Sequence, residues 1–339
     1  MTPAQRAGQL IMVGMTQGGA DDIAAVRASL RDHYVGSAYY AGGWEGAAAV
    51  QAAADSLQGQ TRQAGSPGLL LAADQEGGQV RQLRGNGFTS TVSAVRQGQL
   101  TPSARRAYAA SMGRQLRAAG LNVDLAPVAD TVPAALGKDN GPIGAFDREY
   151  GNDPTKVAAA VSDVVHGFDS SGLAATLKHF PGIGRIAKNT DYSSSGITDS
   201  TTGPDDPYLT PFGAGIRAGA GLVMISSARY PKLDPKHPAT FSAPIITGLL
   251  RQKMGFKGVV ISDDLNTPAL ASTPVQERAV RFVGAGGDLL LTATDRLVPG
   301  LTRGLLARMA SDPAFARVVA GAVQRVMTLK ASLGLVRCG

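Results

Sequence analysis

Charged side chains stand directly after several apolar runs of the sequence, where they could act together on a polar substrate. Two carboxyl groups that face one cavity can cleave a glycosidic bond, since one attacks the anomeric carbon and the other protonates the departing oxygen. We predict Asp263 as the attacking group because it follows the apolar run 258–262, although an aspartate there could instead cap the next helix. The polar groups at the run ends are Asp74-Gln75-Glu76, Asp130, Lys178-His179, Ser226-Ser227 and Asp263-Asp264.

Lys178 and His179 end another apolar run and admit two interpretations. A cation and an imidazole at a strand end can hold sugar hydroxyls, but a lone histidine there can equally be a buried hydrogen-bonding residue. Metal binding is less favoured, because the four histidines are far apart in the sequence and none belongs to an HExxH pair. We therefore expect neither a metal nor another cofactor.

Eight short apolar runs alternate with longer segments of helical pattern, and these elements must position the charged groups. Each run is almost continuously apolar, as expected for parallel strands buried on both faces. Eight strand-then-helix units without a linker predict a single-domain (β/α)₈ TIM barrel over residues 1–339. An open doubly wound sheet is the alternative, but segment 13–18 lacks the expected GxGxxG spacing. The predicted strands are 9–15, 35–40, 68–73, 122–127, 173–179, 221–226, 257–262 and 286–291.

Capping residues followed by proline mark the expected helix starts. A Ser, Thr or Asp cap before a proline is typical of a helix N-terminus. The cap pairs are Thr2-Pro3, Asp153-Pro154, Thr210-Pro211 and Thr273-Pro274.

Two segments rich in Gly, Ser, Thr, Asp and Pro, 182–207 and 226–244, are longer than ordinary connections and predict loops over the catalytic face of the barrel.

The composition excludes several classes of protein. A chain of 339 residues with 44% hydrophobic residues can bury a large core without disulfides, and its one cysteine, Cys338, has no partner in the sequence. The net charge of +7 comes without a run of five basic residues, and only 5% of residues are aromatic, so we expect no nucleic-acid partner. No apolar stretch reaches the length of about 18 residues needed for a membrane span. We expect a monomer, and leave open whether it is cytoplasmic or exported with its signal removed.

Three motifs in this order resemble glycoside hydrolase family 3, in particular its single-barrel bacterial β-N-acetylglucosaminidase branch. They are ADQEGG at 73–78, KHFPG at 178–182 and ISDDL at 261–265, and the ends of the chain also fit. The resemblance implies a TIM barrel, a retaining mechanism through a covalent glycosyl-enzyme and no metal. It also implies removal of terminal β-linked N-acetylglucosamine, often from cell-wall fragments, so the expected partner is a saccharide.

The resemblance assigns roles to individual residues. Asp263 matches the family's nucleophile. The family also has an arginine after its EGG motif, and here Arg81 and Arg84 flank the position that Gln82 occupies, so we predict Arg81. The residues that match the family's sugar-binding set are Asp74, Arg148, Lys178 and His179.

The proton donor is where this sequence departs from the family. In the branch, KHFPG is followed by His-Gly and then Asp-Ser-His on a mobile loop, whose histidine donates the proton. Here 183–193 reads IGRIAKNTDYS and holds no histidine. Counting from Gly184 puts Asp191 at the histidine position, and a one-residue slip puts it at the aspartate position. We predict Asp191 as the replacement donor, its pKa raised by burial and by Asp263, although it could instead only stabilise a turn.

Two further hypotheses follow from the sequence. Tyr39, Tyr40 and Trp44 could form a stacking platform for the leaving sugar, although barrel packing explains the tyrosines equally well. The missing histidine also leaves other functions open: a catalytically lapsed barrel that binds a saccharide or acts in an assembly, or a transferase or phosphorylase that passes the glycosyl group to phosphate or another sugar.

Overall fold

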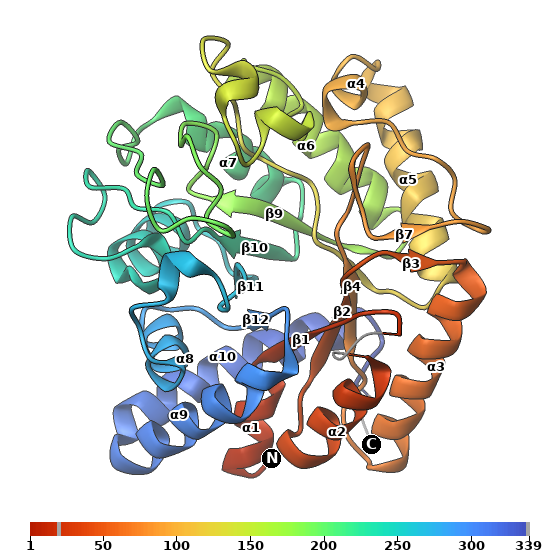
Figure 1. Ribbon diagram of the computed structural model, residues 1–339, viewed down its shortest axis with the longest axis vertical. Coiled ribbons are helices and arrows are strands. Elements are labelled where there is room, and N and C mark those ends of the chain that lie inside the picture. Colours follow the sequence, from red (N-terminus) through yellow and green to blue (C-terminus); the bar gives the residue numbers. More distant parts are fainter. Residues whose placement is uncertain (19–21, 337–339) are drawn as a thin grey trace.

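The computed structural model describes residues 1–18 and 22–336, and within them eight parallel strands form one sheet (Figure 1). The sheet order is β11-β10-β9-β8-β4-β2-β1-β12, so the strands follow one another around the sheet in chain order. Each strand overlaps one of the predicted runs. The strands are β1 (Ile11–Met15), β2 (Ser37–Tyr40), β4 (Leu70–Ala73), β8 (Val123–Asp124), β9 (Ala174–Phe180), β10 (Leu222–Ile225), β11 (Val259–Ser262) and β12 (Leu290–Thr292).

The two edges of this sheet meet and close a barrel. A parallel bridge joins Ile261, in β11, to Leu289, directly before β12. The Ser262 N–H donates to the Leu289 carbonyl at 2.9 Å, and the Leu289 N–H donates to the Val260 carbonyl at 3.0 Å. Closure confirms the predicted (β/α)₈ barrel and excludes the open sheet, which would keep two unpaired edges.

Seven of the eight strands are shorter than the sequence predicts, and β8 and β12 differ most from their predicted ranges. Regular pairing of β8 stops at Asp124, because Pro127 has no N–H for the ladder, and the chain continues beside β9 through one bridge between Val128 and Lys178. The last strand begins at Leu290 rather than at 286. Gly286 has a φ of 108°, so the chain is still turning there.

Helices surround the barrel on its outside (Figure 1). The helix α10 packs beside α1 and α9, which brings both ends of the described chain to one side of the molecule. Two small two-stranded sheets stand in the connections after β2 and β4: β3 (Trp44–Glu45) with β7 (Leu83–Arg84), and β5 (Gln75–Gly77) with β6 (Val80–Arg81). The helices are α1 (Pro3–Gln9), α2 (Ile23–His33), α3 (Ala47–Gln63), α4 (Ala94–Gly98), α5 (Pro102–Ala118), α6 (Pro154–Asp169), α7 (Thr210–Arg217), a π-helix (Pro244–Lys253), α8 (Val275–Gly284), α9 (Val298–Ser311) and α10 (Pro313–Ser332).

Two of the four predicted caps are confirmed and two are wrong. Thr2 forms a capping box with Gln5 at the start of α1, and the Asp153 side chain caps α6. Thr210 lies inside α7, because a 3₁₀ turn capped by Asp206 already begins at Pro207. The helix α8 begins only at Val275, and no side chain caps it.

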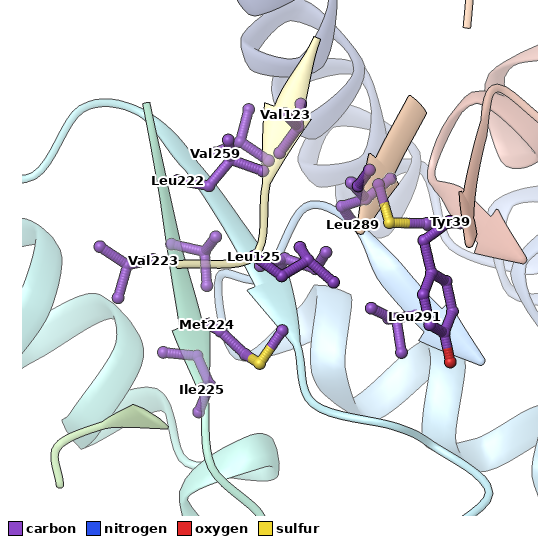
Figure 2. Packing of buried hydrophobic residues seen from close by; sticks show 14 of the residues in the cluster. Tyr39, Val123, Leu125, Leu222, Val223, Met224, Ile225, Val259, Leu289 and Leu291 are labelled. Carbon is purple, nitrogen blue, oxygen red and sulfur yellow. The ribbon is translucent and has the colours of Figure 1, made fainter. Parts of the chain in front are cut away.

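The barrel interior is filled by apolar side chains from facing strands (Figure 2). Val123, Leu222 and Val259 lie together near the amino ends of their strands, with Leu125 and Leu289 in the next part of the core. All of these side chains are buried. The barrel is therefore a packed scaffold that can hold polar groups rigidly at its carboxyl-terminal end.

Two sequence predictions concern features away from the barrel. Cys338 lies outside the described residues. Among the residues that the structure does describe, no helix is both long and apolar enough to cross a membrane.

Candidate active site

A cavity of about 450 Å³ opens at the carboxyl-terminal ends of the barrel strands. Its apolar lining includes Leu125, Met224 and Leu291, which also belong to the packed core shown in Figure 2. Its walls carry six of the seven predicted site residues. These are Asp74, Arg148, Lys178, His179, Asp191 and Asp263.

Asp263 reaches the cavity from the end of β11, whose four residues are fully buried. Its N–H donates to the Ile225 carbonyl at 3.0 Å, so β10 also fixes its position. Burial raises the pKa of Asp263 to about 7, the Asp191 carboxylate adds to this increase, and His179 opposes it. The next helix, α8, begins only at Val275, so Asp263 does not cap it. Its Oδ1 accepts a hydrogen bond from the Asp264 N–H at 3.0 Å, and the residue lines the cavity.

Asp191 lies on the long connection between β9 and α7 and lines the same cavity. Its N–H donates to the Asn189 side chain at 2.9 Å. The preceding residue, Thr190, is buried, and its carbonyl accepts a hydrogen bond from the Thr267 hydroxyl in the connection after β11. This bond ties the loop to the segment that follows Asp263. It explains how this loop carboxylate comes close enough to influence the pKa of Asp263. Asp191 is exposed, so the burial that we expected at this carboxyl group is wrong.

The opposite wall is a buried ion-pair network centred on Glu76. The Lys178 ammonium lies 2.5 Å from Asp74 and 2.6 Å from Glu76, and the Arg148 guanidinium donates to both carboxylate oxygens of Glu76 at 2.7 and 2.8 Å. Burial raises the pKa of Glu76, but the two cations outweigh burial and lower it to about 2. Glu76 is almost fully covered, whereas Asp74 keeps a partly exposed carboxylate. Asp74 can therefore accept hydrogen bonds from sugar hydroxyls while Glu76 holds the cations in place.

His179 is fixed by the buried carboxylate of Asp130. Its Nδ1 lies 2.7 Å from Asp130 Oδ2, and its backbone N–H donates to the same oxygen at 3.2 Å. The other oxygen of Asp130 accepts from the Ile183 N–H at 2.8 Å. An Nδ1–H bond to a carboxylate leaves Nε2 toward the cavity, where Arg148 lies 3.4 Å away. The ring thus presents a defined nitrogen to a ligand.

Other predicted residues lie away from the cavity. Arg81 does not line it, and its guanidinium donates to Ser90 at 3.2 Å, whereas Gln82 does line it. Tyr40 and Trp44 are buried in the core, where their rings meet edge to face at 4.9 Å. Of the three proposed platform aromatics, Tyr39 reaches the cavity.

The ionisable groups that line the cavity are suited to acid–base chemistry. Across residues 1–18 and 22–336, no group of three or more His, Cys, Asp or Glu side chains is placed to hold a metal ion. The expectation of a metal-free reaction stays a prediction. The carboxyl pair of Asp191 and Asp263 is what glycoside hydrolysis requires.

Comparison with known proteins decides the family. The family profile described as "Glycosyl hydrolase family 3 N terminal domain" matches residues 3–329. The chain belongs to glycoside hydrolase family 3. It is therefore a glycoside hydrolase.

Relatives of this family 3 chain agree in sequence and in structure. It is similar to a β-hexosaminidase of Xanthomonas oryzae pv. oryzae, with 36% identity over 252 residues that cover 71% of this chain and 72% of the relative. The crystal structure of β-N-acetylhexosaminidase from Beutenbergia cavernae matches with a TM-score of 0.92 and 36% identity, covering 98% of this chain and 99% of that chain. A family 3 β-N-acetylglucosaminidase from Paenibacillus matches with a TM-score of 0.89 and 30% identity, covering 100% of this chain and 64% of that chain. These likenesses confirm the resemblance and the fold.

Sequence reasoning gave no role to two residues that hold the site of this family 3 hydrolase together. The sequence places Glu76 and Asp130 after their strands but assigns neither of them a partner. Their position could have indicated this role, since carboxylates at the ends of adjacent strands can pair with cations at the ends of other strands. The Lys178–Glu76 and His179–Asp130 pairs become visible only when the strands are side by side.

Glu76→Gln should lower the free energy of unfolding at neutral pH by about 3 to 5 kcal/mol, because it removes the buried negative charge that Arg148 and Lys178 share. The pKa of Glu76 is lowered to about 2, so its ionised form stabilises the fold above its unfolded pKa of about 4.3, and this stabilisation is lost as the pH falls towards 2. Urea denaturation should therefore show a large gap between wild type and variant at neutral pH and a smaller gap in acid.

The matched control is Glu277→Gln on the exposed face of α8, which should change stability by less than about 0.5 kcal/mol. Equal stability of wild type and Glu76→Gln would contradict the network's role.

Proposed function

We propose that this chain is a retaining exo-β-N-acetylhexosaminidase that removes a terminal β-linked N-acetylglucosamine unit from a glycan. Asp263 is the nucleophile and Asp191 is the acid/base group. The observation that carries the proposal is that these two carboxyl groups line one cavity and interact electrostatically. The names of the relatives, which are 30 to 36% identical, support N-acetylglucosamine as the sugar.

The reaction proceeds in two steps. A carboxylate oxygen of Asp263 attacks the anomeric carbon while the bond to the leaving oxygen breaks and Asp191 gives that oxygen its proton. The product is a glycosyl ester of Asp263. Asp191, now ionised, takes a proton from water, the water oxygen attacks the anomeric carbon, and the Asp263 carboxylate leaves. Two inversions retain the configuration, and this mechanism requires carboxyl groups about 5 to 5.5 Å apart when the loop closes on substrate.

The remaining wall residues bind and orient the sugar. Asp74 accepts hydrogen bonds from hydroxyl groups, while Lys178 and Arg148 donate and hold Asp74 and Glu76 in place. His179 opposes the effect of burial on Asp263, which favours the ionised nucleophile. Fixed groups of this kind reduce the reorganisation needed in the transition state.

The proposal is tested by incubating the protein with an aryl β-N-acetylglucosaminide and following the released sugar by proton NMR. We expect turnover, with the β-anomer of N-acetylglucosamine as the first product. The α-anomer as first product would exclude retention. Absence of turnover would favour the alternative of a catalytically lapsed barrel that only binds a saccharide. Adding phosphate distinguishes the phosphorylase alternative, because that activity would release a glycosyl phosphate.

Asp191→Asn should move the acid limb of the pH profile of kcat/KM to lower pH. In the wild type, activity should increase as the pH rises through about 7, because Asp263 then loses its proton. Removing the neighbouring negative charge favours ionised Asp263 and lowers its pKa. A dinitrophenyl glycoside suits this measurement because its leaving group needs no proton. An acid limb at the same pH in both proteins would show that the two carboxyl groups do not interact.

A further inference from the structure

Two aromatic side chains at the catalytic cavity are exposed, and the proposed mechanism uses neither. Phe146 is 40% exposed and Tyr192 is 82% exposed, and both line the cavity that holds Asp263. Among residues 1–18 and 22–336, the other exposed large hydrophobic side chains lie elsewhere: Met1, Tyr34, Val92 and Val318. Leaving an apolar ring in water forgoes the free energy of burying it. Two such rings on one cavity therefore indicate a ligand that covers them.

The position of Phe146 is set by a buried amide. Phe146 ends the 3₁₀ turn Gly144–Phe146 in the connection between β8 and α6. The side-chain oxygen of Asn140 accepts from the N–H groups of Ile143 and Gly144 at 3.0 and 2.9 Å. Asn140 is fully buried. The backbone that carries Phe146 is thus held in place before any ligand binds.

The same amide organises the loop that carries Tyr192. The side-chain nitrogen of Asn140 donates to the carbonyls of Ile183 and Ile186, at 2.9 and 2.8 Å, where the loop after β9 begins. Further along, the Tyr192 N–H donates to the Asn189 carbonyl at 3.2 Å. One buried side chain therefore links the two connections that carry the aromatic rings.

The location of Tyr192 identifies the part of the substrate that it meets. It directly follows Asp191, the group proposed to protonate the leaving oxygen, whereas the sugar undergoing attack is held by Asp74 and Lys178 on the opposite wall. Phe146 comes from a neighbouring barrel connection and lines the same opening. A pyranose ring has an apolar face of C–H groups that packs on aromatic rings. A small alcohol has no such face.

We propose that Phe146 and Tyr192 form the binding site for the leaving group, and that this group is a pyranose sugar rather than a small alcohol. The inference rests on the proposed function and extends it from the cleaved sugar to the leaving sugar. It assigns to Phe146 and Tyr192 the preference for a sugar over a small alcohol as the leaving group.

The experiment compares kcat/KM for two substrates with poor leaving groups. One is the β-1,4-linked disaccharide of N-acetylglucosamine, and the other is methyl β-N-acetylglucosaminide, whose leaving group is too small to cover an aromatic ring. The leaving oxygen of both substrates needs a proton, so a variant that displaces Asp191 would slow both reactions. Loss of aromatic stacking would instead change the ratio of the two kcat/KM values. We expect Phe146→Ala and Tyr192→Ala each to lower the disaccharide-to-methyl ratio about tenfold. Tyr192→Phe keeps the ring and should keep the ratio, and Val318→Ala, outside the cavity, is the control that should leave activity unchanged.

An unchanged ratio in both alanine variants, with turnover intact, would overturn this inference and leave the proposed function standing. If the wild type turns over neither substrate, calorimetry on Asp263→Asn decides the matter. Tighter binding of the disaccharide than of free N-acetylglucosamine, lost when Tyr192→Ala is added, would support the site without hydrolysis. Equal affinities for the two saccharides would overturn it.

Discussion

Asp263→Asn should lower kcat on aryl β-N-acetylglucosaminides by about 10⁴- to 10⁶-fold. The amide has nearly the same shape as the carboxylate but cannot form the glycosyl ester, so the loss falls on the chemical step. The backbone bond from Asp263 to Ile225 remains, and the substitution places no charge in the cavity. We therefore expect a folded protein whose affinity for N-acetylglucosamine, measured by calorimetry, stays close to that of the wild type.

The control for this substitution is Asp205→Asn, since the carboxylate of Asp205 is exposed and pairs with Lys253 on the surface. That variant should keep wild-type kinetics. A loss of less than about tenfold in Asp263→Asn would mean that another residue attacks the sugar.

Asp191→Ala should slow hydrolysis in a way that depends on the leaving group. Substrates with poorly acidic leaving groups should lose about 10²- to 10⁴-fold in kcat/KM, because their oxygen must be protonated as the bond breaks. A dinitrophenyl glycoside should lose much less in this first step, since its leaving group departs as a stable anion. The measurement is a plot of log kcat/KM against leaving-group pKa, which should be much steeper for the variant than for the wild type.

Azide provides a second measurement on the same variant. Once Asp191 is gone, no group activates water for the second step, but the azide anion needs no activation and can attack the glycosyl ester directly. Azide should therefore accelerate turnover of the dinitrophenyl glycoside and yield the β-glycosyl azide. Equal slopes for variant and wild type, together with no effect of azide, would remove Asp191 from the acid/base role.

The barrel could be predicted from the sequence because its strands are buried on both faces. The predicted strand 257–262, for example, holds the unbroken apolar stretch 258–261, and such a stretch is typical of parallel strands covered on both faces. The errors lie at element ends, where local contacts decide. Thr273 precedes a proline and resembles a cap, yet α8 starts later, at Val275. The Thr-Pro pair alone does not show at which residue the first turn of the helix begins.

The cavity wall was predictable to the extent that it depends on strand ends. Asp263, Lys178 and His179 reach the cavity because the strand that carries each one ends there. The role of Glu76 at the centre of the ion-pair network could not be recognised, because its partner Arg148 is 72 residues away in the sequence. Its role arises only when the barrel brings the carboxyl ends of β4 and β9, which flank β8, to the same cavity.

Loop residues were harder to predict than strand residues. Asp191 was found because a carboxyl group stood where the family has its proton donor, but its position depends on the Thr190–Thr267 hydrogen bond, which joins two connections far apart in the chain. Arg81 was misplaced for a related reason. The small sheet of β5 and β6 turns Gln82, not Arg81, into the cavity.

The most direct test of the account is to identify the residue that carries the sugar in the covalent intermediate. A fluorinated N-acetylglucosaminyl fluoride slows the second step more than the first, so the glycosyl ester should accumulate and can be located by mass spectrometry of proteolytic peptides. We predict one glycosyl group per chain, on the peptide that contains Asp263, and none on Asp263→Asn. A sugar attached to any other residue, or turnover of the reagent without a covalent adduct, would contradict the mechanism.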